Sequence, residues 1–320
     1  MHRAVVEGVG HYLPKRVVEN SEFENTLETN DEWIRSRTGI ERRHFADEYE
    51  TTAFMGIEAA QAALDYADCT IDKVDAILVA TSTPDLTFPS VATMIQNGLG
   101  MRHGFAFDVQ AVCAGFVYAL TVANSLIASG QNSRILVIGS ETFSKLMDWT
   151  DRSTCVLFGD GAGAMLVAAQ SNDKSNRGIL ATTLHSDGQY KDLLYVDGGV
   201  SLQTTGYLRM QGKEIFRHAV EKLSEATFEA LEKAGLTTQD VDWVVPHQAN
   251  KRILEGMSKR LNIPTERVIM TVNNHGNTSA ASVPLALSVA LNDNRIKHGD
   301  LVVIGAIGGG LAWGTAVIRW

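Results

Sequence analysis

Two stretches of the chain, ALDYADCTIDKVDAILV (63–79) and ALEKAGLTTQDVDWVVP (230–246), follow one pattern and begin 167 residues apart. Identical residues recur in place, for example Val74 and Val241. Each stretch reads as the end of an amphipathic helix, a short turn and a buried strand. A repeat of this size predicts a fold assembled from two copies of one unit.

A second pair of segments supports the repeat. CAGFVYALTVANSLIASGQNSRILVIGSE starts at residue 113 and NTSAASVPLALSVALNDNRIKHGDLVVIGAIG at residue 277. Both contain a polar residue, small residues, an apolar helix, a glycine-containing turn and a strand, and Gly139 aligns with Gly305. We therefore expect two halves, 1–170 and 171–320, with mostly parallel sheets covered by helices. Two common α/β patterns that coincide are the alternative.

Composition excludes several classes of protein. The chain has 320 residues, 45% of them hydrophobic and 20% charged, which is typical of a folded protein. Its formal net charge of -9 argues against a general nucleic-acid binder, because neutralising phosphates requires massed positive charge. A local basic patch remains compatible with this charge.

The remaining global features predict a cytoplasmic protein without a metal site. The three cysteines, Cys69, Cys113 and Cys155, are widely spaced, which suits neither a disulfide framework nor a zinc site. The N-terminal sequence has no signal-peptide pattern. Residues 301–318 lack charge, but their five glycines favour strand, turn and strand over a membrane span.

Cys113 is the first candidate for chemistry. It lies between the strand-like FAFDV and the helical GFVYALTVANSLI, at a helix N-terminus, where the helix dipole favours a thiolate. A buried structural cysteine is the alternative reading. Cys69, in a helix-to-strand turn, and Cys155, in an apolar strand, are interpreted as structural.

His247 and Asn277 are the second and third candidates. His247 follows the strand VDWVVP, at the junction where ligand sites of such folds gather. Asn277 occupies the repeat equivalent of the Cys113 region, and its carboxamide can donate to a carbonyl oxygen or cap a helix. His275 is a less well placed competitor. The glycines 308–310 can bring a backbone N–H close to a ligand oxygen.

These motifs resemble a known family. DVQAVCAGFVYAL, VPHQAN, NHGNTSAASVPLAL and GGGLAWGTAVIRW are similar to β-ketoacyl-[acyl carrier protein] synthase III, the initiating condensing enzyme of bacterial type II fatty acid synthesis, and NDEWIRSRTGI and TDRSTCVLFGDGAGA add two matches. The resemblance runs along the whole chain. It implies a thiolase-like five-layered α/β/α/β/α sandwich of two duplicated halves, the first carrying Cys113 and the second His247 and Asn277, and a homodimer.

The resemblance also implies a mechanism. Cys113 takes the acyl group of a short acyl-CoA, most readily acetyl-CoA, and malonyl carrier protein then loses CO2 and attacks the acyl-cysteine. His247 and Asn277 stabilise the enolate as neutral donors, completing a Cys-His-Asn triad. The backbone N–H groups of Cys113 and Gly309 form the oxyanion hole. Acyl-CoA is substrate, and no cofactor is implied.

Further contacts follow from the same resemblance. Trp33, Arg37 and Arg152 match positions that hold the adenine end of CoA, and Gly212 and Asn250 match the pantetheine tunnel. The residues implied in binding the acidic carrier protein are Lys213, Arg217, Lys251, Arg252 and Lys259, with Arg260 in the same basic region. Residues 252 and 259, seven apart, share a helix face, although a merely solvated face is the alternative.

The acyl pocket is expected to involve Phe88, Phe158 and Ile307. Phe88 matches a residue that reaches across the dimer interface. Ile307 departs from the family, which often has Phe there, so the range of primers is open. The alternative functions are a paralogue that condenses other acyl groups in secondary metabolism, a non-catalytic carrier-protein or CoA binder, and a thioesterase. An intact Cys-His-Asn set argues against the binder, and the lack of a water-activating base argues against the thioesterase.

Overall fold

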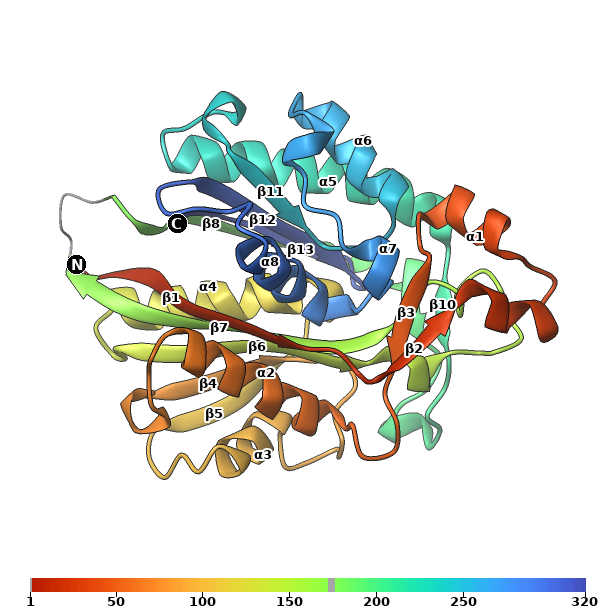
Figure 1. Ribbon diagram of the computed structural model, residues 1–320, viewed down its shortest axis with the longest axis horizontal. Coiled ribbons are helices and arrows are strands. Elements are labelled where there is room, and N and C mark those ends of the chain that lie inside the picture. The colour runs from red at the N-terminus through yellow and green to blue at the C-terminus, as the bar shows by residue number, and fades with distance from the viewer. Residues whose placement is uncertain (1, 172–175) are drawn as a thin grey trace.

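The computed structural model describes residues 2–171 and 176–320, which form five layers (Figure 1). Helices α4 and α8 lie between two sheets, α2 and α3 cover one sheet, and α5 and α6 cover the other. The bounds of these helices are α2 (Thr52–Tyr66), α3 (Val91–Gly98), α4 (Gly115–Ala128), α5 (Gly212–Lys233), α6 (Lys251–Leu261) and α8 (Ser282–Asn292). The expected α/β/α/β/α sandwich is confirmed.

The two sheets have matching strand orders. The first is β1-β7-β6-β4-β5 and the second, taken from the matching edge, is β8-β13-β12-β11. Their strands are β1 (His2–Tyr12), β4 (Ala76–Ala80), β5 (Phe105–Val109), β6 (Arg134–Thr142) and β7 (Asp160–Ser171), then β8 (Gly178–Ser186), β11 (Trp243–Pro246), β12 (Leu301–Gly308) and β13 (Ala312–Arg319). The isolated bridge of Val268 to Val244 takes the place of a fifth strand in the second sheet.

The expectation of mostly parallel sheets is wrong. Only β4–β5, β4–β6 and β11–β12 pair in parallel, whereas β1–β7, β6–β7, β12–β13 and β8–β13 are antiparallel. A helix connects the parallel strands, because a parallel crossover needs a long connection. β13 instead follows β12 through the turn at residues 309–311, so it returns antiparallel.

The offset of 167 residues recurs through each half. It separates the starts of β4 and β11, of α4 and α8, of β6 and β12, and of the 3-10 turns Val112–Ala114 and Ser279–Ala281. Cys113 therefore corresponds to Ala280, and Asn277 corresponds to Gln110, so the direct alignment of Cys113 with Asn277 was three residues out. Because β7 ends at Ser171 and β8 begins at Gly178, we propose the boundary between the halves near residue 170.

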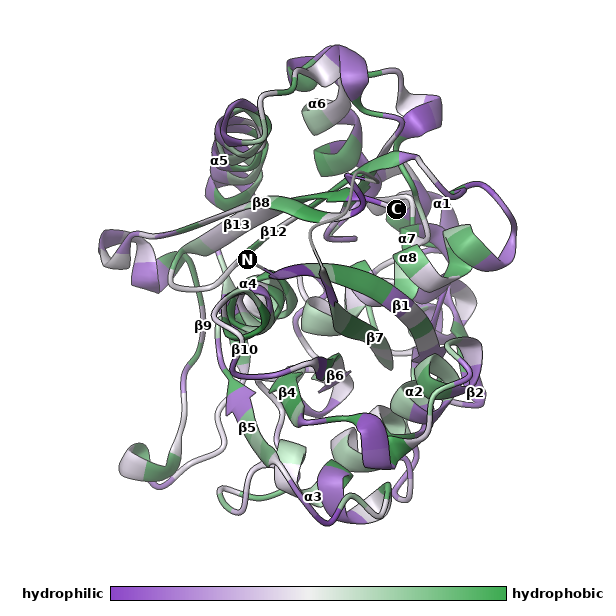
Figure 2. Ribbon diagram, turned by 90° about the vertical axis from the view of Figure 1, so that its left-hand side faces the viewer, coloured by the Kyte–Doolittle hydropathy of each residue, from purple (hydrophilic) through white to green (hydrophobic). Residues whose placement is uncertain are grey.

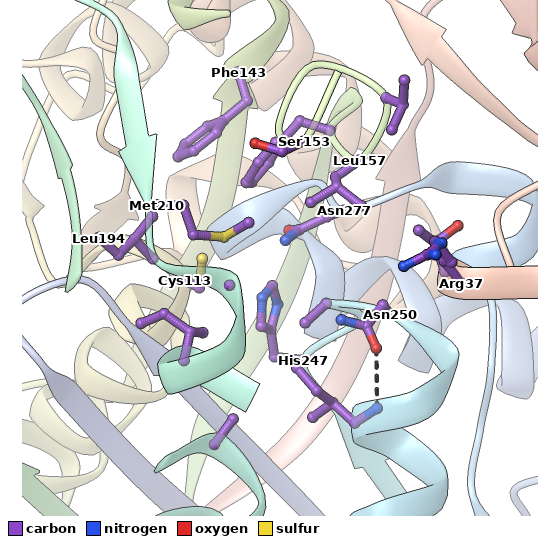
Figure 3. Close-up of a pocket in the computed structure, with 18 of the residues that line it drawn as sticks. Arg37, Cys113, Phe143, Ser153, Leu157, Leu194, Met210, His247, Asn250 and Asn277 are labelled. Carbon is purple, nitrogen blue, oxygen red and sulfur yellow. Dashed lines mark hydrogen bonds between the residues drawn. The ribbon is translucent and has the colours of Figure 1, made fainter. Parts of the chain in front are cut away.

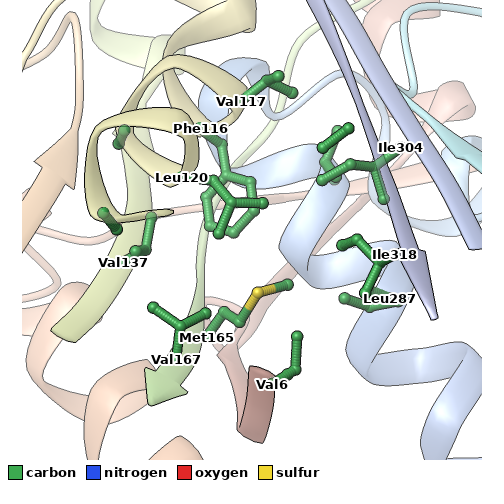
Figure 4. Close-up of a cluster of buried hydrophobic side chains, with 14 of the residues drawn as sticks. Val6, Phe116, Val117, Leu120, Val137, Met165, Val167, Leu287, Ile304 and Ile318 are labelled. Atoms are coloured by element: carbon green, nitrogen blue, oxygen red, sulfur yellow. The ribbon is translucent and has the colours of Figure 1, made fainter. Parts of the chain in front are cut away.

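Helix α4 is apolar around most of its circumference because it is buried between the sheets. Phe116, Val117 and Leu120 are fully buried and lie with side chains of both sheets and of α8 (Figure 4). In Figure 2, the α4 ribbon lies between the two sheets, and α5 carries polar segments. Burying such side chains stabilises the fold by about 1.5–3 kcal/mol each and fixes the start of α4, just after Cys113.

Smaller elements complete the fold. Two short helices, α1 (Asp31–Thr38) and α7 (Val272–His275), and two strand pairs, β2 (Arg16–Glu19) with β3 (Arg42–Phe45) and β9 (Leu194–Val196) with β10 (Leu208–Met210), lie at one end of the molecule (Figure 1). The strand–turn–strand expected over 301–318 is confirmed by β12 and β13. No helix within the described ranges is long and apolar enough to cross a membrane. Cys155 lies in a turn rather than the predicted strand.

Candidate active site

A cavity of about 370 Å³ lies where the two halves meet, and side chains of both halves line it (Figure 3). The sequence-derived candidates that line it are Cys113, His247, Asn277, Trp33, Arg37, Arg152, Gly212, Asn250, Phe158 and Ile307. The sulfur of Cys113, the imidazole of His247 and the carboxamide of Asn277 face one another in its interior (Figure 3). The structure thus brings Cys113 together with His247, which follows it by 134 positions in the chain, and with Asn277, which follows it by 164.

Cys113 lies in the 3-10 turn Val112–Ala114, directly before α4. Its side chain is almost fully buried, and this burial raises the pKa of the thiol to about 12. A hydrogen bond with Ser279 opposes the rise, and the negative charge of Glu141 adds to it. Desolvation thus opposes the thiolate that the helix N-terminus is expected to favour, and that expectation stays a prediction.

His247 is held as a neutral donor by a serine. It follows β11, and its Nδ1 lies 2.6 Å from the Ser282 hydroxyl. That hydroxyl oxygen accepts from the backbone N–H of Gln248, so its proton is free to be donated to Nδ1. With that donation, we assign the ring proton to Nε2. Burial lowers the pKa of His247 to about 3, which keeps the imidazole neutral.

Hydrogen bonds to the backbone fix the orientation of the Asn277 side chain and main chain. Its Oδ1 accepts from the backbone N–H of Ser279 at 2.9 Å. Its own backbone N–H donates to Leu157 and its carbonyl accepts from Gly159, so Phe158 and Asn277 form a parallel bridge. With the oxygen occupied, the amide N–H₂ group is the free donor of the side chain.

The glycine run lies against the turn that carries Cys113. A Cβ on Gly308 would lie 2.6 Å from the backbone nitrogen of Cys113, and one on Gly309 would lie 2.6 Å from the carbonyl oxygen of Leu194. Only glycine permits these approaches. Gly308 therefore adjoins the backbone of Cys113, whereas Gly309 adjoins Leu194 and Val112 and does not itself line the cavity, so the role predicted for Gly309 stays a prediction.

Two guanidinium groups lie over one indole at the outer part of the cavity. The Cζ atoms of Arg37 and Arg152 are 4.9 and 5.1 Å from the Trp33 ring. Arg152 also donates to the carbonyl of Glu28. Asn250 caps α6 by accepting from the backbone N–H of Ile253 at 3.0 Å (Figure 3).

The remaining predicted residues lie outside the cavity. Phe88 is 82% exposed on the loop before α3. The basic residues lie on α5 and α6 in one outer layer, and several have acidic neighbours: Arg217 with Glu214, Lys251 with Glu255, and Arg260 with Glu225. The structure therefore places this basic surface on the helices that carry Gly212 and Asn250.

Sequence reasoning missed three polar residues beside the triad. Ser279 and Ser282 lie within the NTSAASVP motif, where hydroxyls among small residues were the available signal. Glu141 ends the strand VIGSE and is fully buried, with no signal to separate it from a surface acid. No cluster of three or more possible metal ligands occurs among the residues described.

Comparison with known proteins agrees with this geometry. Family models for 3-oxoacyl-[acyl-carrier-protein] synthase III match residues 107–188 and, for its C-terminal part, 231–320. A β-ketoacyl-[acyl-carrier-protein] synthase III of Ruegeria sp. (strain TM1040) is 68% identical over 320 residues, with 99% of each chain covered. The chain belongs to this synthase III family.

Solved structures of related proteins share the fold over their full length. The family's Aquifex aeolicus member is 45% identical with a TM-score of 0.94, covering 99% of this chain and 100% of that one. The priming β-ketosynthase of the R1128 polyketide pathway is 34% identical with the same TM-score, covering 99% and 96%. The synthase III fold is thus also used by a polyketide enzyme.

Proposed function

We propose that this synthase III family member condenses a short acyl-CoA, acetyl-CoA by preference, with malonyl-acyl carrier protein to initiate fatty acid elongation. The observation that carries the proposal is the convergence of Cys113, His247 and Asn277 in one cavity (Figure 3). The thioester of the primer transfers its acyl group to the Cys113 sulfur and CoA leaves. The enolate formed by decarboxylation of the malonyl group then attacks the acyl-cysteine, releasing 3-oxoacyl carrier protein.

Two neutral donors suit the decarboxylation step. As CO2 leaves, negative charge develops on the malonyl thioester oxygen. The Nε2–H of His247 and the N–H₂ of Asn277 are the free donors at the cavity, and both are buried, where hydrogen bonds to developing charge are strong. The backbone N–H groups of Cys113 and Gly309 would stabilise the tetrahedral oxyanion of acyl transfer.

The outer part of the cavity suits CoA. Trp33 offers a ring for adenine, and the guanidinium groups of Arg37 and Arg152, already over that ring, offer charge for phosphates. Gly212 and Asn250 line the same cavity, in which the pantetheine arm would extend towards Cys113. Phe158 and Ile307 line the inner part, where the acyl group would lie. The proposal requires no cofactor or metal.

The partner proteins follow from two surfaces. The basic residues on α5 and α6 offer positive charge beside the cavity to an acidic acyl carrier protein. The other surface exposes edge strand β5 and apolar side chains, namely Leu86, Phe88, Phe105, Phe107, Val200 and Leu202. An open strand edge with an apolar patch favours pairing with a second copy. We propose a homodimer there, with Phe88 reaching the partner's acyl pocket, and a cytoplasmic location.

The alternative, a paralogue that condenses other acyl groups in secondary metabolism, has the R1128 enzyme as its precedent. It is not favoured, because the synthase III relative is far more similar in sequence.

The proposed function is tested by labelling with acyl-CoA. In Cys113→Ser, transfer of radiolabelled acetyl from CoA to the protein should be abolished, because the weaker nucleophile cannot form the acyl-cysteine. Cys69→Ser, at a cysteine outside the cavity, should label like the wild type. Retained labelling of Cys113→Ser would assign the nucleophile to another residue.

A further inference from the structure

The proposed acyl transfer requires a group that takes the proton of Cys113 before the CoA thiolate is released. Cys113 carries its proton at rest, since burial raises the pKa of the thiol to about 12. His247 is assigned as a donor to the substrate, with its Nδ1 facing the Ser282 hydroxyl at 2.6 Å and its proton on Nε2, so in the proposed mechanism it does not take this proton. Some other group must accept it when the sulfur–carbon bond forms.

Ser279 connects the thiol to a buried carboxylate. The turn that Ser279 opens packs against the turn that carries Cys113. The Ser279 hydroxyl donates to Oε1 of Glu141 at 3.0 Å, so its oxygen is left to accept from the Cys113 thiol. Both Ser279 and Glu141 are completely buried. A chain of thiol, hydroxyl and carboxylate therefore runs away from the cavity, behind the nucleophile.

The carboxylate is arranged to leave one oxygen for the serine. Its Oε2 accepts from the Thr83 hydroxyl at 2.5 Å, from the backbone N–H of Ser82 at 3.1 Å and from the Thr81 hydroxyl at 3.2 Å. Oε1 accepts from Ser279. Ser279 is itself held at a φ of +49°, a left-handed conformation rare for a side chain other than glycine.

We propose that Ser279 and Glu141 form a proton relay for Cys113, an inference that rests on the proposed acyl transfer. The thiol proton moves to the Ser279 oxygen as the Ser279 proton moves to Oε1 of Glu141. The Cys113 sulfur bonds to the acyl carbon, and the CoA thiolate leaves and takes a proton from solvent.

The second half-reaction reverses the relay. When the enolate carbon bonds to the acyl carbon, the bond to the Cys113 sulfur breaks with the electron pair on sulfur. Glu141 returns its proton through Ser279 to that sulfur, which restores the resting thiol. Each turnover then takes up one solvent proton, on CoA, and Glu141 ends as it began.

The acid–base properties of Glu141 suit this role. Burial raises its pKa to about 7, against the lowering effect of its four hydrogen-bond donors. Cys113 is the titratable group that faces it from the turn before α4. The hydrogen-bond donors of Glu141 do not titrate near neutral pH, because they are three hydroxyls and one backbone amide. They come from residues 81–83, which follow β4, and from Ser279. A base with this pKa is about half ionised at pH 7, so it can both take and return a proton near neutral pH.

Single-turnover acyl transfer to Cys113, measured across pH 7, tests the relay. In the wild type the rate should rise with pH, reach half its maximum near pH 7 and level off above it, as Glu141 ionises. Glu141→Gln should be slower by at least about tenfold at neutral pH and should keep rising towards alkaline pH, where the thiol itself ionises. Ser279→Gly should behave alike, and glycine accommodates the positive φ, so its fold is preserved.

Glu50→Gln is the matched control, the same change at a buried carboxylate outside the cavity. It should keep the wild-type rate and the same pH profile, with its midpoint near pH 7. A Glu141→Gln variant that transfers acyl groups at the wild-type rate, or that keeps the same levelling, overturns the relay and leaves the proposed function intact. A wild-type protein that takes no acyl group from acyl-CoA overturns the proposed function instead.

Discussion

Val112 and Ser279 occupy equivalent positions in the two halves and share one backbone conformation, with φ angles of +48° and +49°. Each opens a 3-10 turn that leads into the central helix of its half. In the first half, the next residue is Cys113. In the second, the strained residue itself interacts with the Cys113 thiol.

Duplication thus produced two strained turns that meet at the cavity with different side chains. A left-handed conformation costs a non-glycine residue about 1–2 kcal/mol, so surrounding packing must hold it in place. The buried central helices supply that packing. One copy of the turn carries the nucleophile, and the other carries the hydroxyl behind it, next to the loop that holds Asn277.

Ser282→Ala should impair condensation while sparing the fold. The Ser282 hydroxyl sets the proton of His247 on Nε2, so its loss should lower malonyl decarboxylation by about tenfold or more. Acyl transfer to Cys113 should change less. Ser288→Ala is the matched control, because Ser288 bonds to His11 from the same helix at 2.8 Å. Equal activities in the two variants would contradict the role of Ser282.

His247→Ala and Asn277→Ala should separate the two half-reactions. Each removes a donor to the developing enolate, so decarboxylation of malonyl carrier protein should fall by about 10²–10³-fold. Labelling of Cys113 by acetyl-CoA should survive better. The comparison is made with His275→Asn, at a buried histidine of the preceding turn that does not line the cavity. Equal loss of both half-reactions would refute this division of roles.

The sequence predicted the fold because its determinants are local and repeated. The helix, turn and strand of 63–79 and of 230–246 carry enough pattern to show the duplication. The β12–β13 hairpin was predicted from its glycine turn, whereas the antiparallel pairing of β7 with β1 and β6 was missed, because strand direction depends on connections that hydrophobic pattern does not encode. Cys113, His247 and Asn277 were predicted to share one site. The place of Glu141 beside that site was not predicted, because its hydrogen-bond donors, Ser279 and residues 81–83, are distant from it in the sequence.

The protein should lose stability in mild acid. Burial lowers the pKa of His275 to about 4 and that of His247 to about 3. Both pKa values lie below the ordinary value of 6.5, so the unfolded chain binds more protons and stability falls as pH drops from 6.5 towards 4. The full shift at His275 is worth ~3 kcal/mol. The measurement is urea unfolding of the wild type, of His275→Asn and of the exposed-site control His298→Asn at several pH values. The free energy of unfolding of His275→Asn should fall less steeply with decreasing pH than that of the wild type, whereas His298→Asn should follow the wild type.

Arg252→Glu should weaken use of the carrier protein more than use of CoA. Arg252 lies on α6 beside the cavity entrance, where its charge would attract an acidic partner. The KM for malonyl carrier protein should rise severalfold and more steeply at low salt, while the KM for acetyl-CoA changes little. Arg102→Glu, the same charge reversal at an exposed site near α3, should leave both constants unchanged. Equal changes in both KM values of Arg252→Glu would rule out carrier binding at this surface.

Ile307→Phe should narrow the range of primers. Ile307 lines the inner cavity at the end of β12, paired with Trp313 across the β12–β13 hairpin, so a larger planar ring would occupy acyl space. The ratio of kcat/KM for octanoyl-CoA or isobutyryl-CoA to that for acetyl-CoA should fall by about tenfold, since one methylene in such a pocket is worth ~1–3 kcal/mol. Ile215→Phe, which narrows the same cavity beside Gly212, should affect all three primers alike, because they share the pantetheine chain. An unchanged primer ratio in Ile307→Phe would place the acyl group elsewhere in the cavity.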